Sequence, residues 1–442
     1  MQRLHETMTE IFNEDCRETM KRMSDNSIDS IVTDPPAGIS FMNKHWDGDR
    51  GGRDHWIKWL EEIMKEGLRV LKPGGHAFVW ALPRTSHWTA MALENAGFEI
   101  RDCVYHVFGS GFPKSLDISK AINKKLGGDN VIIGKRKHPT LRDTSLIEEQ
   151  ANAAHGNNSW AREWNITSPT TERAKQWDGF GSALKPAVEC WWLCRKPLSE
   201  KTIAENVLKW GVGGINIDAC RIPLVGENDP RLGGNGSWQT DKGMVKNVYQ
   251  GGFVGKETYS HQDGRFPSNF IHDGSDEVLE HFPDSDGCQP HKINSKNIKY
   301  NGWGSITNKQ GELVGYNGRG SASRFFYCAK PSPTEKNMGC SDLPLRSSGD
   351  ILARGGYDDH APTAQNNHPT VKALTLMEYL VTMITPPGGT CYDLFAGSGT
   401  TLMACEKNEI NGIGSEAESD YCDIAKRRVS ATKGHGQQSI FK

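Results

Sequence analysis

The sequence predicts an α/β protein with a parallel, helix-flanked sheet. Residues 1–130 and 368–430 alternate short apolar runs of strand length with longer runs of helical periodicity, the order that produces such a sheet. The region between them differs, because it is rich in glycine and asparagine and shows no fixed-period repeat. A chain of 442 residues is long enough for one large α/β domain that carries an insertion.

The first α/β stretch contains alternating strands and helices. They are expected at 28–33 (strand), 56–71 (helix), 76–80 (strand), 86–96 (helix) and 99–106 (strand). The segment 72–75, Lys-Pro-Gly-Gly, is expected to stop the first helix, since proline and glycine interrupt regular structure. The apolar run 188–195 predicts a further buried strand, with Trp191 and Trp192 in the sheet core.

The second α/β stretch repeats the pattern and sets the domain boundaries. Its elements are expected at 374–384 (helix), 390–394 (strand), 400–407 (helix), 410–415 (strand) and 421–429 (helix). We therefore divide the chain into an N-terminal part of the core at 1–197, with a polar surface insertion at about 131–182, an irregular module at 198–365, a C-terminal part of the core at 366–430 and a flexible tail at 431–442.

Composition restricts the class of protein. The formal charge of −2 lacks the basic excess that would announce nucleic-acid binding, so any DNA contact must come from local patches. The 11 cysteines are scattered, and the close pair Cys190 and Cys194 has no second pair at zinc-ligand spacing, so we expect a reduced protein without a metal site. No apolar run reaches the roughly 18 residues of a membrane span and no signal peptide is visible, which predicts a cytoplasmic protein that does not bind a membrane.

The first candidate site is Asp34-Pro35-Pro36-Ala37, placed where the strand at 28–33 ends. Proline has no N–H, so an acid followed by two prolines forms a rigid corner whose carboxylate and carbonyl oxygens remain free to accept hydrogen bonds. Such a corner suits the recognition of an exocyclic amino group.

The second candidate site is the turn 393–401, Asp-Leu-Phe-Ala-Gly-Ser-Gly-Thr-Thr, between a strand and a helix. Gly397 and Gly399 allow a ligand to approach the backbone and the N-terminus of the following helix. Glu416 stands at the end of the next strand, where an acid binds a ribose diol in nucleotide-binding βαβ units.

These motifs together resemble the amino-group DNA methyltransferases. The acceptor corner comes first, a variable region second, and His368-Pro369-Thr370-Val371-Lys372 with the glycine turn last, an order similar to that of the permuted β subgroup. Phage and prophage adenine-N6 members share the segments 109–114 (Gly-Ser-Gly-Phe-Pro-Lys), 264–269 (Gly-Arg-Phe-Pro-Ser-Asn) and 323–330 (Ser-Arg-Phe-Phe-Tyr-Cys-Ala-Lys). The resemblance therefore reaches from both ends of the chain into its middle.

The resemblance implies a Rossmann-like methyltransferase sheet with helices on both faces, S-adenosylmethionine as methyl donor and adenine N6 in double-stranded DNA as acceptor. It places Asp34, Pro35, Pro36 and Ala37 at the catalytic corner, where Asp34 and the Pro35 carbonyl accept hydrogen bonds from the amino group. It assigns the cofactor to Asp393, Phe395, Ala396, Gly397, Gly399, Thr400, Glu416, His368, Thr370 and Lys372. Direct in-line transfer then needs no covalent intermediate, and the target base must be flipped out of the duplex.

The chain departs from the family pattern at Ala37, where relatives carry Tyr, Phe or Trp. A ring that stacks on a base is worth roughly 1–3 kcal/mol, so its absence weakens capture of the flipped base. Ala37 is either an engineered substitution in a competent enzyme or a sign of natural degeneracy, and Phe41 or Trp46 could supply a substitute ring. Further departures are Ala373 and Leu394 in place of proline, and Val188-Glu189 where relatives often have His-Glu.

The irregular module at 198–365 is the expected target-recognition domain, with backbone contacts expected from Lys242, Lys246, Lys256 and Arg265. We expect the protein to act in restriction–modification, in a bacterial or phage-infected cell. A second copy of the chain, which would form a homodimer, is one possible partner. Two alternatives stay open: an N4-cytosine methyltransferase, since the same corner serves any exocyclic amine, and a catalytically inactive DNA-binding homologue. An RNA or protein-glutamine methyltransferase is disfavoured, because those usually carry Asn at position 34.

Overall fold

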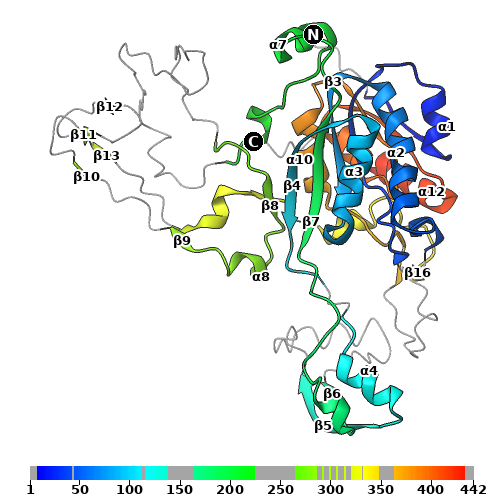
Figure 1. Cartoon of the computed structure of the whole chain (residues 1–442). Helices are drawn as coiled ribbons and strands as arrows, with labels where there is room; N and C mark the ends of the chain where they lie inside the picture. The colour runs from blue at the N-terminus through cyan, green and yellow to red at the C-terminus, as the bar shows by residue number, and fades with distance from the viewer. Residues whose placement is uncertain are drawn as a thin grey trace. The chain divides into compact units, whose positions relative to one another are not determined.

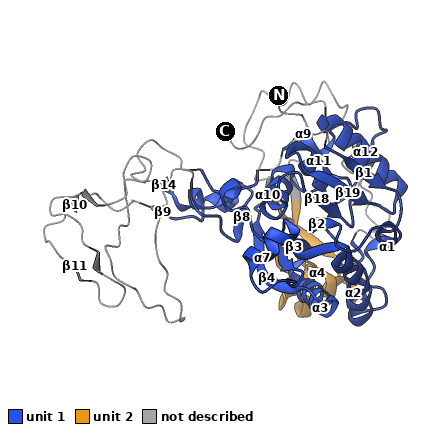
Figure 2. Ribbon diagram, turned by 90° about the horizontal axis from the view of Figure 1, so that it is seen from above, with its two compact units in different colours: residues 1–109, 188–442 blue, residues 110–187 orange. Residues whose placement is uncertain are grey.

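The computed structural model in Figure 1 shows a large α/β unit with a second, smaller unit inserted in its chain. The residues that it describes are 7–41, 44–111, 115–137, 163–223, 264–285, 291–292, 298–299, 305–306, 313–314, 320–330, 332–347 and 363–433. The large unit comprises residues 1–109 and 188–442, and the small unit residues 110–187 (Figure 2).

A nine-stranded sheet forms the centre of the large unit, in the order β1-β19-β18-β2-β3-β7-β4-β8-β15. Its strands are β1 (Thr9–Phe12), β2 (Ile28–Thr33), β3 (Leu71–Ala81), β4 (Glu99–Val107), β7 (Val188–Arg195), β8 (Phe270–His272), β15 (Tyr327–Cys328), β18 (Thr390–Asp393) and β19 (Asn411–Ser415). Neighbouring strands run parallel, except that β7 is antiparallel to both β3 and β4. Strands from opposite ends of the chain, β2 and β18, therefore lie side by side at the middle of the sheet.

Helices cover both faces of this sheet (Figure 1). The helices of the large unit are α1 (Cys16–Lys21), α2 (Arg53–Val70), α3 (Ser86–Ala96), α7 (Ile203–Trp210), α8 (Asp276–Leu279), α9 (Pro333–Lys336), α10 (Leu374–Ile384), α11 (Thr400–Lys407) and α12 (Ser419–Lys433). Short two-stranded pairs are β9 (Asp284–Ser285) with β14 (Gly320–Ser321), β10 (His291–Lys292) with β13 (Leu313–Val314), β11 (Ile298–Lys299) with β12 (Ser305–Ile306), and β16 (Arg346–Ser347) with β17 (Thr363–Ala364).

Alternation along the strands separates two hydrophobic cores. On β2, Ile31 packs with α1, α2 and α3, whereas the next residue, Val32, packs with α10 and α11. On β3, Phe78 and Val79 divide between the two cores in the same way. Because successive strand side chains point to opposite faces, every second residue continues one core. The α/β class, with helices on both faces, is confirmed.

Two details of the sequence prediction are wrong. The sheet is mixed rather than parallel, because the chain returns from the inserted unit as β7 and pairs in reverse with β3 and β4. Residues 72–75 do not form a separate stop, since they lie within β3, where the register with β2 shifts between Ile28 and Ser30. Lys196 fixes this irregular segment by exchanging backbone hydrogen bonds with Gly74 and Gly75. Tertiary pairing therefore outweighed the local signal of proline and glycine.

The small unit holds two helices, α4 (Ile118–Lys125) and α6 (Glu172–Lys175), and one hairpin, β5 (Asn130–Lys137) paired antiparallel with β6 (Glu163–Pro169), among its described residues. The Asn123 side chain links these elements: it donates to the Asp129 carbonyl and accepts hydrogen bonds from the N–H and hydroxyl of Thr171. Polar contacts therefore contribute much of its internal order. Across the described part of the whole chain, no helix is long and apolar enough to cross a membrane.

Candidate active site

The two motifs predicted from sequence meet at the carboxyl ends of the adjacent strands β2 and β18. The Thr33 hydroxyl, at the end of β2, donates to Asp393 Oδ1 at the end of β18 over 2.8 Å. The backbone N–H of Phe395 approaches both the Thr33 hydroxyl and Asp393 Oδ1 at 3.2 Å. Because ligands of open α/β sheets bind outside the carboxyl ends of their strands, this junction is the candidate active site.

The chain after the acceptor corner is held by hydrogen bonds rather than by an aromatic side chain. Asp47 accepts from the backbone N–H of Gly38 at 3.0 Å and of Phe41 at 2.7 Å, which closes the loop 38–47. Gly38 has a φ of +69°, and a Cβ there would stand 2.6 Å from the Trp56 ring. A residue larger than glycine cannot follow Ala37 without moving Trp56, so the corner packs tightly against α2 even with a small residue at position 37.

A half-buried lysine connects the acceptor corner to a second carboxylate. Lys372 Nζ lies 3.2 Å from Asp34 Oδ2 and 3.1 Å from Glu189 Oε2, and 4.1 Å from the centroid of the Trp80 ring. The Trp80 indole N–H donates to Glu189 Oε2 at 2.6 Å, and His106 Nδ1 lies 2.8 Å from Glu189 Oε1. These five residues come from the residue after β2, from β3, β4 and β7, and from the segment before α10, and we call them the Lys372 cluster.

Burial and charge act in opposite directions within the Lys372 cluster. Burial raises the pKa of Asp34 to about 6, against the opposing effect of Lys372. Burial would also raise the pKa of Glu189, but Lys372 and His106 outweigh it and lower that pKa to about 2. For Lys372, burial is outweighed by Asp34 and Glu189, so its pKa lies above the ordinary value. Lys372 and Glu189 are therefore an ion pair at neutral pH, and the Asp34 carboxyl becomes protonated at a higher pH than an ordinary aspartate.

The glycine turn adopts the conformation that the sequence predicts. Gly397 and Gly399 have φ values of +52° and +79°, and added Cβ atoms would lie 2.8 Å from His368 Nε2 and 2.9 Å from Ala425 Cβ. Glu416 Oε2 accepts the Gly397 N–H at 2.8 Å. Burial raises the pKa of Glu416 to about 7. Glycine is required at both positions, and the acid at the end of β19 contacts the turn directly.

Aromatic side chains surround His368 beside this turn. The ring of His368 stacks on Trp46, with centroids 6.4 Å apart, and meets the Tyr421 ring edge-on at 4.6 Å. Burial, reinforced by Arg428, lowers the pKa of His368 to about 3, so this imidazole is neutral. The buried indole N–H of Trp46 has no hydrogen-bond partner among the described residues. An unpaired buried donor, a carboxylate and a glycine cradle form the kind of setting that a nucleoside cofactor fits.

Arg428, on α12, forms hydrogen bonds with the glycine turn. Its side chain is fully buried, and Nη1 donates to the Ser398 carbonyl at 2.6 Å, the Ser398 hydroxyl at 3.0 Å and the Thr400 hydroxyl at 2.9 Å. Nη2 donates to the Glu335 carbonyl at 3.1 Å. Burial lowers the pKa of Arg428 to about 10. The turn is therefore fixed by a cation that binds neutral oxygens.

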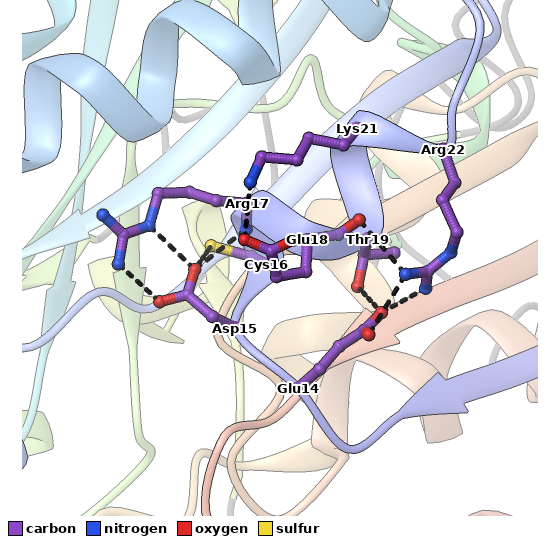
Figure 3. Close-up of polar contacts among 8 residues, drawn as sticks. All are labelled: Glu14, Asp15, Cys16, Arg17, Glu18, Thr19, Lys21 and Arg22. Atoms are coloured by element: carbon purple, nitrogen blue, oxygen red, sulfur yellow. Dashed lines mark hydrogen bonds and ion pairs between the residues drawn. The ribbon is translucent and has the colours of Figure 1, made fainter.

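The loop after β1 leads into α1, and Figure 3 shows the polar contacts among residues 14–22. Because β1 runs parallel to β19, this loop lies beside Glu416, and Asn13 Nδ2 donates to the Glu416 carbonyl at 2.9 Å. Asp15 caps α1 by accepting from the Arg17 N–H at 2.9 Å, and the Arg17 guanidinium binds the same carboxylate. Sequence reasoning missed this strand and loop, because a four-residue strand gives too short a pattern.

The other predicted residues have different outcomes. Ala396 is buried in the turn and donates its N–H to the Ser415 carbonyl, whereas Thr370 is exposed next to His368. Arg265 is half-buried with its guanidinium 5.0 Å from the centroid of the Phe325 ring. Lys242, Lys246 and Lys256 lie outside the described residues. Lys372, expected near the cofactor, contacts Asp34.

Sequence reasoning also missed residues that the structure brings to the site, namely Trp80, His106, Glu189 and Arg428. Glu189 carried a signal, because an acid within a buried strand needs a partner. The other three had none, since a tryptophan, histidine or arginine in a regular element is usual on packing grounds alone. Only the sheet order β2-β3-β7-β4 shows that Trp80, Glu189 and His106 lie on neighbouring strands. Lys372 then connects Glu189 to Asp34.

Fold and site together define a Rossmann-like α/β protein in which an acceptor corner and a glycine turn meet at adjacent strand ends. The sequence model of the DNA methylase family, which groups N6 and N4 methyltransferases, matches residues 28–120 and 284–427. These residues make up more than half of the chain, which therefore belongs to the DNA methylase family. The family resemblance inferred from the motifs is confirmed, and S-adenosylmethionine is the cofactor of that family.

Curated relatives match over short segments. The chain is 31% identical to the type II methyltransferase M.BamHI of Bacillus amyloliquefaciens over 74 residues, which are 17% of this chain and 18% of that protein. It is 26% identical to M.HindIII of Haemophilus influenzae over 125 residues, 21% of this chain and 40% of that protein. The chain thus spans two fifths or less of the length of these relatives.

Solved structures with a similar chain path align with nearly the whole chain at low sequence identity. A complex of M1.HpyAVI with SAM aligns over 96% of this chain and 99% of that chain, with 15% identity and a TM-score of 0.35. The cytosine-N4-specific PvuII methyltransferase aligns over 95% of this chain and 87% of that chain, with 12% identity and a TM-score of 0.43.

Proposed function

We propose that this protein transfers a methyl group from S-adenosylmethionine to the N6 amino group of adenine at specific sites in double-stranded DNA, in a bacterial or phage-infected cell. The observation that carries the proposal is the meeting of an acceptor corner and a glycine turn at adjacent strand ends, with Thr33 bonded to Asp393. Family membership supports it.

The residues around the glycine turn would hold the cofactor. Gly397 and Gly399 leave room for close approach to the backbone, and the carboxylate of Glu416 retains acceptor capacity for ribose hydroxyls beyond the Gly397 N–H that it already binds. Trp46 and His368 offer a ring surface and an unpaired N–H next to this acid. When bound there, S-adenosylmethionine supplies an electrophilic methyl group.

The corner would hold and polarise the amino group of the target base. Asp34 accepts one N–H and the Pro35 carbonyl the other, because neither group has a hydrogen-bond donor of its own at neutral pH. As the nitrogen acquires positive charge, the Asp34 carboxylate stabilises it, and removal of a single preorganised hydrogen-bonding group from an active site typically costs roughly 2.7–4 kcal/mol. Lys372 keeps Asp34 in place and, with Glu189 beside it, keeps the cluster net negative towards the developing charge.

Position 37 bears on activity, since Ala37 offers no ring to a flipped base. Its carbonyl accepts from the Thr85 hydroxyl at 3.4 Å, so the main chain of the corner is tied to the start of α3 whatever the side chain is. We therefore expect weak capture of the base rather than a distorted corner. Restoring an aromatic side chain should raise the affinity for the flipped base by about one to two powers of ten.

The test is to incubate the parent chain and its Ala37→Tyr form with labelled S-adenosylmethionine and unmodified bacterial DNA, then to identify the labelled nucleoside. Label in N6-methyladenine, stronger for the Tyr form, is the expected result. Label in N4-methylcytosine would replace the adenine proposal by the alternative that the same corner permits. Cofactor binding and DNA binding without transfer by either form would instead establish an inactive homologue.

A further inference from the structure

We propose that the small unit, residues 110–187, binds the DNA backbone and groove through its β5–β6 hairpin and the end of α4. This inference rests on the proposed function, because it assigns the DNA of that reaction to a particular surface. It adds to the irregular module at 198–365 a second DNA-contacting part that the sequence did not predict.

The small unit and the rest of the chain differ in the sign of their net charge. Residues 110–187 contain 12 Lys or Arg and 8 Asp or Glu, a formal charge of +4, which leaves −6 for the remaining residues. A chain with a total of −2 therefore concentrates its positive charge in the inserted unit. Phosphate contacts require such local concentration, since an acidic surface repels the duplex.

Within the small unit, cations lie along the hairpin and at the end of α4. Lys124 and Lys125 are exposed in the last turn of α4 and form no ion pair with any described residue. β5 ends in Lys135-Arg136-Lys137, of which Lys135 is exposed. A two-stranded antiparallel ribbon of this kind is narrow enough to enter the major groove, so its shape as well as its charge fits a duplex.

The apolar side chains of this unit face outward rather than inward. Buried nonpolar residues among its described part are Ala174 and Pro169, whereas Ile132 and Ile133 on β5 are 62% and 64% exposed. Trp177 and Phe180, 45% and 56% exposed, form an edge-to-face pair with centroids 5.2 Å apart. Half of the large exposed hydrophobic side chains in the described chain belong to this unit. Basic and aromatic side chains interleaved on one small module are typical of nucleic-acid binding.

The test compares two triple variants of the full chain that each lose three positive charges. One carries Lys124→Gln, Lys125→Gln and Lys135→Gln in the small unit, and the control carries Lys58→Gln, Lys65→Gln and Lys209→Gln on α2 and α7 of the large unit. Binding to a labelled DNA fragment of unmodified sequence is measured over a range of salt concentrations, with S-adenosylmethionine affinity as the check that the large unit is intact.

We expect the small-unit variant to bind DNA at least about tenfold more weakly at 0.1 M salt, with a log–log salt slope shallower by about 1 to 3, since each lost phosphate contact removes roughly 0.9 from the slope. The control should behave like the parent chain. Equal loss in both variants, or unchanged binding by the small-unit variant, would overturn the inference. So would a change in oligomeric state by sedimentation with DNA affinity intact, which would mark the surface as a contact between copies. Failure of the parent chain to bind DNA or transfer label would instead refute the proposed function.

Discussion

The acceptor corner and the glycine turn follow adjacent parallel strands, yet they are held in different ways. Asp34 is held by charge, because its contact is the ammonium of Lys372, which Glu189 shares. The backbone of the turn at 397–399 is held by two hydrogen bonds: Glu416 accepts from the Gly397 N–H, and Arg428 donates to the Ser398 carbonyl. The corner should therefore respond to protonation, and the turn to the removal of a single donor or acceptor.

This difference corresponds to the task of each part. A turn that binds a cofactor must present one backbone shape at all times, and a buried arginine bonded to carbonyl and hydroxyl oxygens fixes such a shape. A carboxylate that stabilises charge during reaction must stay ionised in a buried place, which its neighbours decide through electrostatics. Substitutions at Asp34, Glu416, Arg428 and Lys372 test this difference between the corner and the turn.

The largest effect is expected from Asp34→Asn. It removes the charged acceptor but keeps the volume, so methyl transfer should fall by about a hundredfold to a thousandfold. Cofactor affinity should stay within twofold or so, because Asp34 lies in the corner and not in the turn. Single-turnover rates and calorimetry with S-adenosylmethionine measure the two effects, in the parent chain and in the Ala37→Tyr form. A variant that lost cofactor binding to the same degree would show that the two sites are not separate.

Glu416→Ala should weaken cofactor binding and leave the transfer rate nearly unchanged, the reverse of Asp34→Asn. A hydrogen bond to a charged group contributes about 1.5–3 kcal/mol, so above pH 7, where Glu416 is ionised, the dissociation constant for S-adenosylmethionine should rise about ten- to a hundredfold. The rate at saturating cofactor should change little, since the corner is intact. Glu418→Ala is the matched control, because it removes a neighbouring carboxylate but keeps the backbone N–H that Glu418 donates to Glu416. Equal losses for both variants would contradict the role of Glu416.

Arg428→Met should reduce stability and cofactor affinity together. The variant leaves the Ser398 and Glu335 carbonyls without their donor, at a cost of about 1–3 kcal/mol for each buried group left unsatisfied. We expect a lower midpoint in thermal unfolding and weaker cofactor binding, with Arg428→Lys intermediate. Arg427→Met is the control, since that side chain forms exposed ion pairs with Asp342 and Asp423. If Arg427→Met destabilised the protein as much, the turn would not depend on Arg428.

The smallest and most specific effect concerns pH. Because burial raises the pKa of Asp34 to about 6, the transfer rate should fall as the pH drops through 6 and the carboxylate becomes protonated. Lys372 lowers this pKa and Glu189 raises it, so Lys372→Met should move the acid limb of the pH profile upward and Glu189→Gln should move it downward. Asp393 also raises it, as a second nearby carboxylate. Shifts of equal sign in both variants would contradict the opposite effects of Lys372 and Glu189 on the pKa of Asp34.

Most of the core could be predicted from the sequence, because its signals are local. The helix predicted at 86–96 and the strand at 188–195 coincide with α3 and β7, since apolar periodicity and flanking breakers fix both type and ends. The glycines of the turn were predictable for the same reason, as only glycine takes their positive φ without strain. By contrast, the segment 72–75 was misread, because its place within β3 depends on pairing with β2 and Lys196.

The sequence by itself determined the chemistry at each strand end: an acid before two prolines at Asp34, two glycines after β18, and an acid at Glu416. These features depend on a few consecutive residues, so they can be recognised without a structure. The tertiary structure alone decided which distant groups surround them, namely Lys372 and Glu189 at the corner and Arg428 behind the turn. The physical reason is that electrostatic and hydrogen-bond partners are chosen by the order of strands in the sheet, and this order is a global property of packing that no spacing along the chain encodes.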